Sequence, residues 1–176
     1  GACGNNLREC DVVLKIGKRV ENYLKAAGVE TKLVQVDGLN AIANAANYWG
    51  ADYFVSIHCN SYNTSANGTE TYCYAKGTTA EKLANSIHAR IVKNFPELTN
   101  RGVKTASYSV LRNTKMPACL VETAFIDNVH DAKILVERED DFARAIACGV
   151  TDFLGIKPDI IDQPTKNICP TCGREL

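Results

Sequence analysis

Apolar side chains recur at spacings of three and four residues in five segments of the chain, which is the pattern of amphipathic helices. The first of these segments covers residues 6–27, where Asn5 or Asn6 is expected to cap the start of the helix and Gly28 to end it. The same spacing predicts further helices over residues 40–49, 80–94, 131–136 and 140–154.

Short runs rich in β-branched and aromatic residues lie between these segments and predict strands. The predicted strands cover residues 31–36, 53–58, 69–74, 107–111 and 118–122. Strands that alternate with helices in this order are typical of an α/β fold. We therefore expect a single α/β domain with a mixed, mostly parallel sheet that is flanked by helices on both faces.

The pattern changes after residue 154. Residues 155–176 contain three of the five prolines, little helical periodicity and the pair Cys169 and Cys172 in a CPTC motif. We expect the folded domain to cover residues 1–154 and a linker or tail to cover residues 155–176. The cysteine pair supplies two of the four ligands of a structural zinc site, so a metal-bearing tail is the alternative.

The composition is that of a globular protein with balanced charge. Hydrophobic residues make up 45% of the chain, and 20 Lys and Arg balance 20 Asp and Glu. Nucleic acid is not expected as a partner, because its binding requires clustered, uncompensated basic residues. Without an apolar run of about 18 residues, no membrane span is expected. The eight cysteines are expected to be mostly reduced, because several lie in apolar runs.

Two predicted strands end in a side chain that is costly to bury. His58 follows the residues Phe-Val-Ser-Ile, and Glu122 follows Ala-Cys-Leu-Val. A buried, unpaired carboxylate is strongly unfavourable, so Glu122 should either have a cation nearby or reach solvent in a cleft. Taken singly, His58 is also consistent with a core histidine bonded to backbone, and Glu122 with a strand end that emerges into water.

Glu9 lies in the first turn of the first predicted helix, where the helix dipole favours acidic residues whatever their function. If a strand preceded Gly1, this turn would lie at the sheet edge where His58 and Glu122 are expected, because parallel strands share their carboxyl edge. Two carboxylates and one imidazole suit a zinc ion, since catalytic zinc sites use about three protein ligands from His, Glu and Asp. The three residues therefore form a candidate zinc site.

Several further motifs occur in order along the first 154 residues. They are Gly1-Ala2-Cys3-Gly4 followed by Glu9, residues 51–60 with His58, Gly68-Thr69-Glu70, Arg101-Gly102-Val103-Lys104, Val110-Leu111-Arg112, Met116-Pro117 followed by residues 118–122, and Phe125-Ile126-Asp127-Asn128. In this combination the chain resembles the zinc-dependent N-acetylmuramoyl-L-alanine amidases of bacteria and their phages.

The resemblance implies a zinc-dependent hydrolase that acts on peptidoglycan, at the amide between N-acetylmuramic acid and the L-alanine of the stem peptide. Carried over to this sequence, it makes Glu9 and His58 zinc ligands and Glu122 the catalytic carboxylate. Asn60, in the polar loop over residues 60–68, and Arg112 are expected contacts for sugar or peptide. We expect a monomer that acts outside the cell or in the cell wall.

One feature of the family is not found in the sequence. The family's first strand ends in a Gly-His segment whose His is a further zinc ligand, and this segment lies ahead of the Gly-Ala motif. The sequence begins at Gly1, so we expect that strand and ligand to be missing from it. His88 and His130 match no ligand position and are expected to be exposed or partly packed. The alternative function is a non-catalytic, peptidoglycan-binding relative without a working zinc site.

Overall fold

The computed structural model describes residues 1–157, so most of the predicted tail and its cysteine pair lie outside the described residues. Among these residues, no helix is both long and apolar enough to cross a membrane. The elements are β1 (Cys3–Gly4), β2 (Leu7–Arg8), α1 (Glu9–Ala26), α2 (Leu39–Trp49), β3 (Phe54–Asn60), β4 (Thr69–Cys73), α3 (Thr79–Asn94), β5 (Asn100–Thr105), α4 (Ser109–Arg112), β6 (Ala118–Phe125), α5 (Val129–Glu137) and α6 (Glu139–Leu154).

The central sheet has four strands in the order β3-β6-β4-β5. β3 is parallel to β6 and β4 is parallel to β5, whereas β4 is antiparallel to β6. The mixed α/β architecture is therefore confirmed. The antiparallel pair at the centre matters for the site, because it brings β4 next to β6 in the opposite direction.

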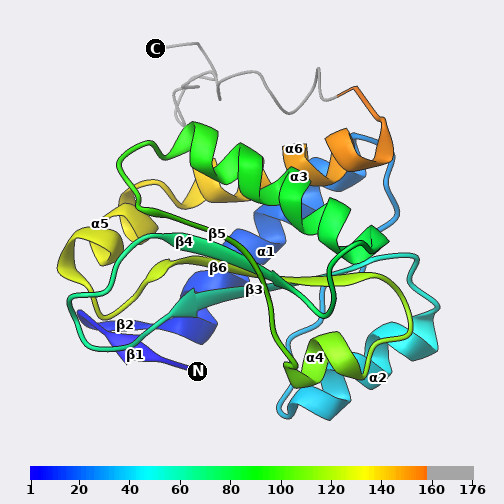
Figure 1. The fold of residues 1–176 in the computed structure, drawn as a ribbon, viewed down its shortest axis with the longest axis horizontal. Coiled ribbons are helices and arrows are strands. Elements are labelled where there is room, and N and C mark those ends of the chain that lie inside the picture. Colours follow the sequence, from blue (N-terminus) through cyan, green and yellow to red (C-terminus); the bar gives the residue numbers. More distant parts are fainter. Residues whose placement is uncertain (158–176) are drawn as a thin grey trace, which may run out of the picture.

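Helices cover the two faces of the sheet unequally (Figure 1). α1, α3 and α6 pack on one face, where a large core includes the fully buried Ile16, Ile87, Val121 and Ile146. On the other face, α2 and α4 lie under one end of the sheet, and the β1–β2 hairpin lies under the other end. The apolar cluster beneath α2 and α4 is small, so part of this face is left for polar side chains.

Two of the predicted strands do not form. Residues 31–36 pair with no strand among the described residues. The extended conformation that their β-branched side chains favour is therefore not stabilised by backbone hydrogen bonds to a neighbouring strand. Residues 107–111 run instead into α4, whose adjacent residues Val110 and Leu111 are both buried. β5 was not predicted, because Gly102 and alternating charged residues interrupt its pattern; it is an edge strand whose side chains stay partly exposed.

Asn5 and Asn6 do not cap α1. They form the turn of the β1–β2 hairpin with φ angles of 50° and 62°, a left-handed conformation that asparagine tolerates better than most residues. Arg8 is the residue before the helix and provides no side-chain cap. The hairpin therefore determines where α1 begins, and it makes Glu9 the first helical residue.

The contact between α3 and α6 leads to a prediction on stability. A Cβ atom added to Gly149 would lie 2.4 Å from the Cα atom of Ile87, so the two backbones would have to separate. We expect Gly149→Ala to lower the free energy of unfolding by about 1–3 kcal/mol. In the matched variant Gly17→Ala, the new methyl group would meet only the tip of the Leu33 side chain, at 2.9 Å. Urea unfolding should show little loss for Gly17→Ala, and equal losses would contradict the close packing of α3 and α6.

Candidate active site

Three ionisable side chains form a row across neighbouring strands. His58 of β3 and Glu122 of β6 are register partners, and Glu70 of β4 is the partner of Glu122 on its other side. Register partners point to the same face of a sheet. This face also carries Leu120, two residues before Glu122, in the small cluster under α2 and α4. The row therefore lies just beyond the part of the face that these helices cover.

The position of the row corrects the expectation of a shared strand edge. β3 continues to Asn60 and β6 continues to Phe125, so His58 and Glu122 lie within their strands. What brings them together is the register and the alternation of side chains, which direct both to one face.

Glu9 reaches this row from the start of α1. Its Oε1 atom lies 2.8 Å from Nδ1 of His58 and accepts a hydrogen bond from the backbone N–H of Cys59 at 3.3 Å. The backbone N–H of Ala2 donates to Oε2 at 2.7 Å. On the other side of the imidazole, Nε2 of His58 lies 2.9 Å from Oγ of Ser56. Both ring nitrogens thus have partners, which fixes the orientation of the ring.

The electrostatics of the Glu9–His58 pair favour the ionised carboxylate and the protonated imidazole. Burial on its own would raise the pKa of Glu9, but the hydrogen bonds from His58 and Ala2 outweigh it and hold that pKa below its ordinary value. Burial would lower the pKa of His58, but the bond to Glu9 and the negative charges of Glu122 and Glu9 raise it. The pocket around His58 is therefore one that stabilises positive charge.

Glu122 lacks the partners that a buried carboxylate normally has. Its Oε2 atom is buried and has no hydrogen-bond donor among the described residues. Burial raises the pKa of Glu122 to about 7; the nearby His58 opposes this shift, and the charges of Glu9 and Glu70 add to it. A carboxylate in this condition is suited to exchange protons near neutral pH.

Glu70 is a member of the row that sequence reasoning did not assign to the site. Its side chain is 3% exposed, and Asn60 Nδ2 donates to its Oε1 atom at 2.6 Å. Arg101 Nε donates to Oε2 at 3.0 Å, and Lys104 Nζ also bonds to Oε2. Burial would raise the pKa of Glu70, but the two cations lower it, so Glu70 stays ionised. The signal in the sequence was an acid in a buried strand and two cations in the strand that pairs with it.

The two predicted substrate contacts lie in different surroundings. Asn60 adjoins the site, because its amide bonds to Glu70. Arg112 is exposed on α4, and its Nη1 atom donates to the carbonyl oxygen and the hydroxyl of Ser107, both at 3.2 Å. The structure thus brings Asn60, but not Arg112, into hydrogen-bond contact with the row. Contact with substrate stays a prediction for both.

The remaining histidines take no part in the site. His88 is more buried than expected, at 6% exposure, and its ring nitrogens lie 3.2 Å from Oγ1 of Thr71 and 2.9 Å from Oδ1 of Asn100. His130 has a largely exposed side chain at the start of α5. Within residues 1–157, no group of three or more His, Cys, Asp or Glu is arranged to hold a metal ion. Among the described residues, the thiols of Cys3, Cys10, Cys59, Cys73 and Cys119 form no disulfide.

On one face of its sheet, this α/β domain gathers a Glu–His pair and a buried carboxylate that has no donor among the described residues, which is the kind of arrangement found in enzyme active sites. A family model described as N-acetylmuramoyl-L-alanine amidase (Amidase_3) matches residues 1–152, and the chain belongs to this family. Membership of the N-acetylmuramoyl-L-alanine amidase family, which the sequence motifs indicated, is thereby confirmed.

Individual relatives agree with this assignment. N-acetylmuramoyl-L-alanine amidase LytC of Bacillus subtilis is 38% identical over 162 residues, which cover 87% of this chain and 32% of LytC. The endolysin of Bacillus phage SPP1 is 38% identical over 189 residues, covering 99% of this chain and 69% of the endolysin. The structure of amidase AmiC2 of Nostoc punctiforme matches with a TM-score of 0.82 and 35% identity, over 88% of this chain and 89% of that one. The chain thus spans about a third of the length of LytC and most of the AmiC2 structure.

Proposed function

We propose that this domain is the catalytic part of a zinc-dependent peptidoglycan hydrolase that cleaves the amide between N-acetylmuramic acid and L-alanine. The observation that carries the proposal is the buried Oε2 atom of Glu122, which has no hydrogen-bond partner among residues 1–157. Glu122 lies on β6, next to His58 of β3, which pairs with Glu9. Family membership supports the substrate class. The proposed enzyme acts on the cell wall or outside the cell, in keeping with relatives described as a probable cell wall amidase and an endolysin. We propose that it acts as a monomer.

The donor atoms of the site suit zinc in their chemistry. Glu9 and His58 provide one carboxylate and one imidazole, and their facing atoms are 2.8 Å apart. Catalytic zinc sites use about three protein ligands from this set. The proposal therefore requires one ligand besides Glu9 and His58.

In the proposed mechanism, zinc supplies Lewis acidity, which lowers the pKa of water and polarises a carbonyl group. Glu122 takes a proton from the attacking water at its unpartnered Oε2 atom and delivers it to the leaving nitrogen of L-alanine. Nδ1 of His58 and the facing Oε1 atom of Glu9 would be the atoms that hold zinc, while Ser56 keeps the His58 ring in place through Nε2.

The test combines zinc removal with analysis of the products. Treatment of the enzyme with a chelator should abolish release of soluble peptidoglycan fragments, and one equivalent of zinc should restore it. New free amino groups should belong to L-alanine, without new reducing sugar ends. Cleavage that yields reducing ends, or full activity in the metal-free enzyme, would contradict the proposal.

A non-catalytic peptidoglycan-binding domain is the second candidate. The observation in its favour is that residues 1–157 hold no group of three metal-binding side chains. This candidate predicts that the protein sediments with isolated peptidoglycan, releases no amino groups and retains no stoichiometric zinc after dialysis. Retention of zinc together with cleavage would exclude it.

A further inference from the structure

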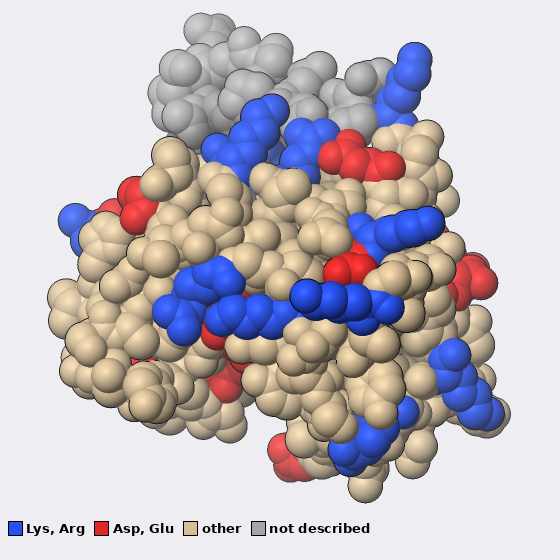
Figure 2. Space-filling view, in the orientation of Figure 1, with Lys and Arg blue, Asp and Glu red and all other residues tan. Residues whose placement is uncertain are grey.

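Two basic side chains of β5 lie beside the row of site residues. Arg101 and Lys104 both bond to Oε2 of Glu70, which is the register partner of Glu122. Their side chains are 32% and 40% exposed, so each reaches solvent while it holds Glu70. Figure 2 shows basic side chains in a band across the middle of the face where β5 lies in Figure 1, with acidic side chains partly visible beneath.

The cluster formed by Glu70, Arg101 and Lys104 carries more positive than negative charge. Arg101 and Lys104 supply two positive charges and Glu70 supplies one negative charge. Both oxygens of Glu70 are already bonded, Oε1 to Asn60 and Oε2 to the two cations, so Glu70 has little capacity for a ligand. Its role is to hold the cations in place, because a buried carboxylate anchors the side chains that neutralise it.

Donor groups remain for an external anion. A guanidinium has five N–H donors and an ammonium has three. Arg101 uses Nε on Glu70 and a long bond of 3.5 Å from Nη1 to the carbonyl oxygen of Asn67. Among the described residues, the ammonium group of Lys104 bonds only to Glu70. A carboxylate could therefore bind both cations without breaking their contacts with Glu70.

The spacing of the strands sets the distance between the two cations and the amide that is cleaved. Neighbouring strands lie about 4.8 Å apart, so the β5 backbone is about 10 Å from that of β6, which carries Glu122. An extended peptide advances about 3.3–3.6 Å per residue. Suppose that the amide at the amino end of a peptide lies at Glu122. A carboxylate of that peptide that reaches Arg101 and Lys104 then belongs to one of about its first three residues.

We propose that Arg101 and Lys104, held by Glu70, form a subsite for a carboxylate of the stem peptide on the leaving-group side of the scissile amide. The inference rests on the proposed function, since it requires the amide to be cleaved next to Glu122. The subsite also orients the substrate, so that the peptide lies over β4 and β5. An amidase with this subsite discriminates between stem peptides by their charge near the scissile bond.

The test compares two muramoyl peptides that differ in one group, a carboxylate or a carboxamide on the second residue of the stem. The wild-type enzyme should cleave the carboxylate form with a kcat/KM about tenfold higher, because a charge-assisted bond to partly exposed cations is of that size. Lys104→Met should reduce the preference to about twofold or less, mainly through KM, since the lost contact is remote from the reacting atoms. Lys104→Arg should retain most of the preference.

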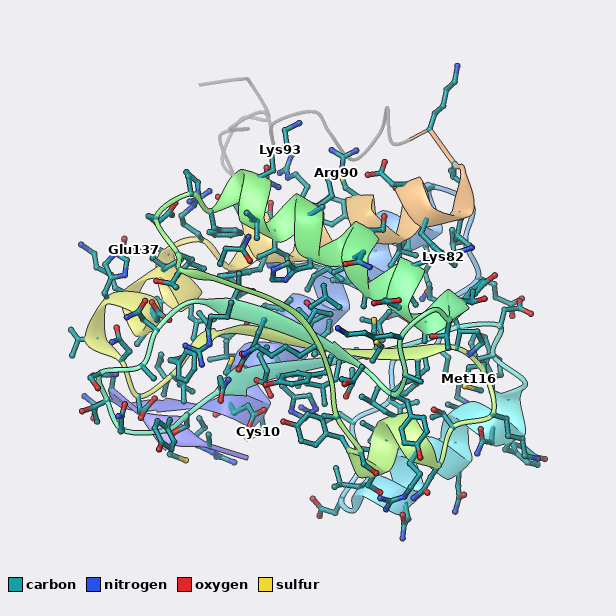
Figure 3. All side chains as sticks on the ribbon, viewed as in Figure 1. Cys10, Lys82, Arg90, Lys93, Met116 and Glu137 are labelled. Carbon is teal, nitrogen blue, oxygen red and sulfur yellow. The ribbon has the colours of Figure 1, made fainter. Side chains whose placement is uncertain are left out.

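The matched control is Lys82→Met, which removes one positive charge from α3 on the opposite side of the sheet (Figure 3) and should leave the preference intact. If Lys104→Met unfolds, Lys104→Gln provides a second neutral variant, and the wild-type preference is measured in any case. Equal cleavage of the two substrates by the wild type would overturn the subsite and leave the proposed function standing.

A binding measurement tests carboxylate recognition separately from amide cleavage. Calorimetry with the Glu122→Gln variant should show about tenfold tighter binding of the carboxylate form of the uncleaved substrate. If the wild type cleaves neither substrate but this binding difference is found, the proposed function fails and only carboxylate binding by Arg101 and Lys104 stands. If neither cleavage nor a binding difference is found, both are overturned.

Discussion

Glu122→Gln is expected to lower the rate of amide cleavage by about 10²–10⁴-fold, the usual contribution of a positioned general acid–base group. Glutamine has nearly the same shape but takes up no proton at neutral pH. Oε2 of Glu122 has no hydrogen bond among the described residues, so the amide loses no partner at that atom. The fold and the zinc content should therefore be unchanged. Release of L-alanine amino groups measures the rate, and circular dichroism checks the fold.

Glu137→Gln is the matched control for this prediction. Glu137 lies on α5 at the surface, where it pairs with Lys133 at 3.8 Å (Figure 3). The same chemical change should leave cleavage within about twofold of the wild type, because exposed ion pairs contribute little. If Glu122→Gln retained near wild-type activity, Glu122 would not be the proton carrier.

His58→Ala is expected to remove zinc and, with it, nearly all activity. Changes to residues that only support a zinc ligand lower zinc affinity by about 10–100-fold, and loss of a ligand should exceed this. Glu9 keeps its bonds from the backbone N–H groups of Ala2 and Cys59, so the start of α1 should stay in place. Zinc content after dialysis, measured by atomic spectroscopy, and cleavage rate provide the two readouts.

His88→Gln distinguishes a zinc ligand from a structural histidine. His88 is buried on α3 and bonds to Thr71 and Asn100, on the opposite face of the sheet from Glu122. Its replacement should lower the melting temperature while zinc content and activity per folded molecule stay near the wild-type values. Loss of zinc in both variants would mean that His58 acts through the fold and not as a ligand.

Local patterns in the sequence predicted most of the elements correctly. The helices α1, α2, α3, α5 and α6 and the strands β3, β4 and β6 occur where spacing and residue type indicated. The errors fall where tertiary contacts decide the outcome. Residues 31–36 have strand-forming residues but no strand partner among the described residues, and β5 forms although Gly102 interrupts its pattern.

The sequence by itself determined which residue types could carry the chemistry. Burying a Glu or His costs free energy, so such a residue inside an apolar strand stands out in the sequence. The sequence therefore indicated His58 and Glu122 and, through ordered motifs, Glu9 and the family. Only the tertiary structure decided how these residues meet, because register and strand direction depend on contacts between distant segments. The antiparallel pairing of β4 with β6 put Glu70 opposite Glu122, and β5 then added Arg101 and Lys104 beside it.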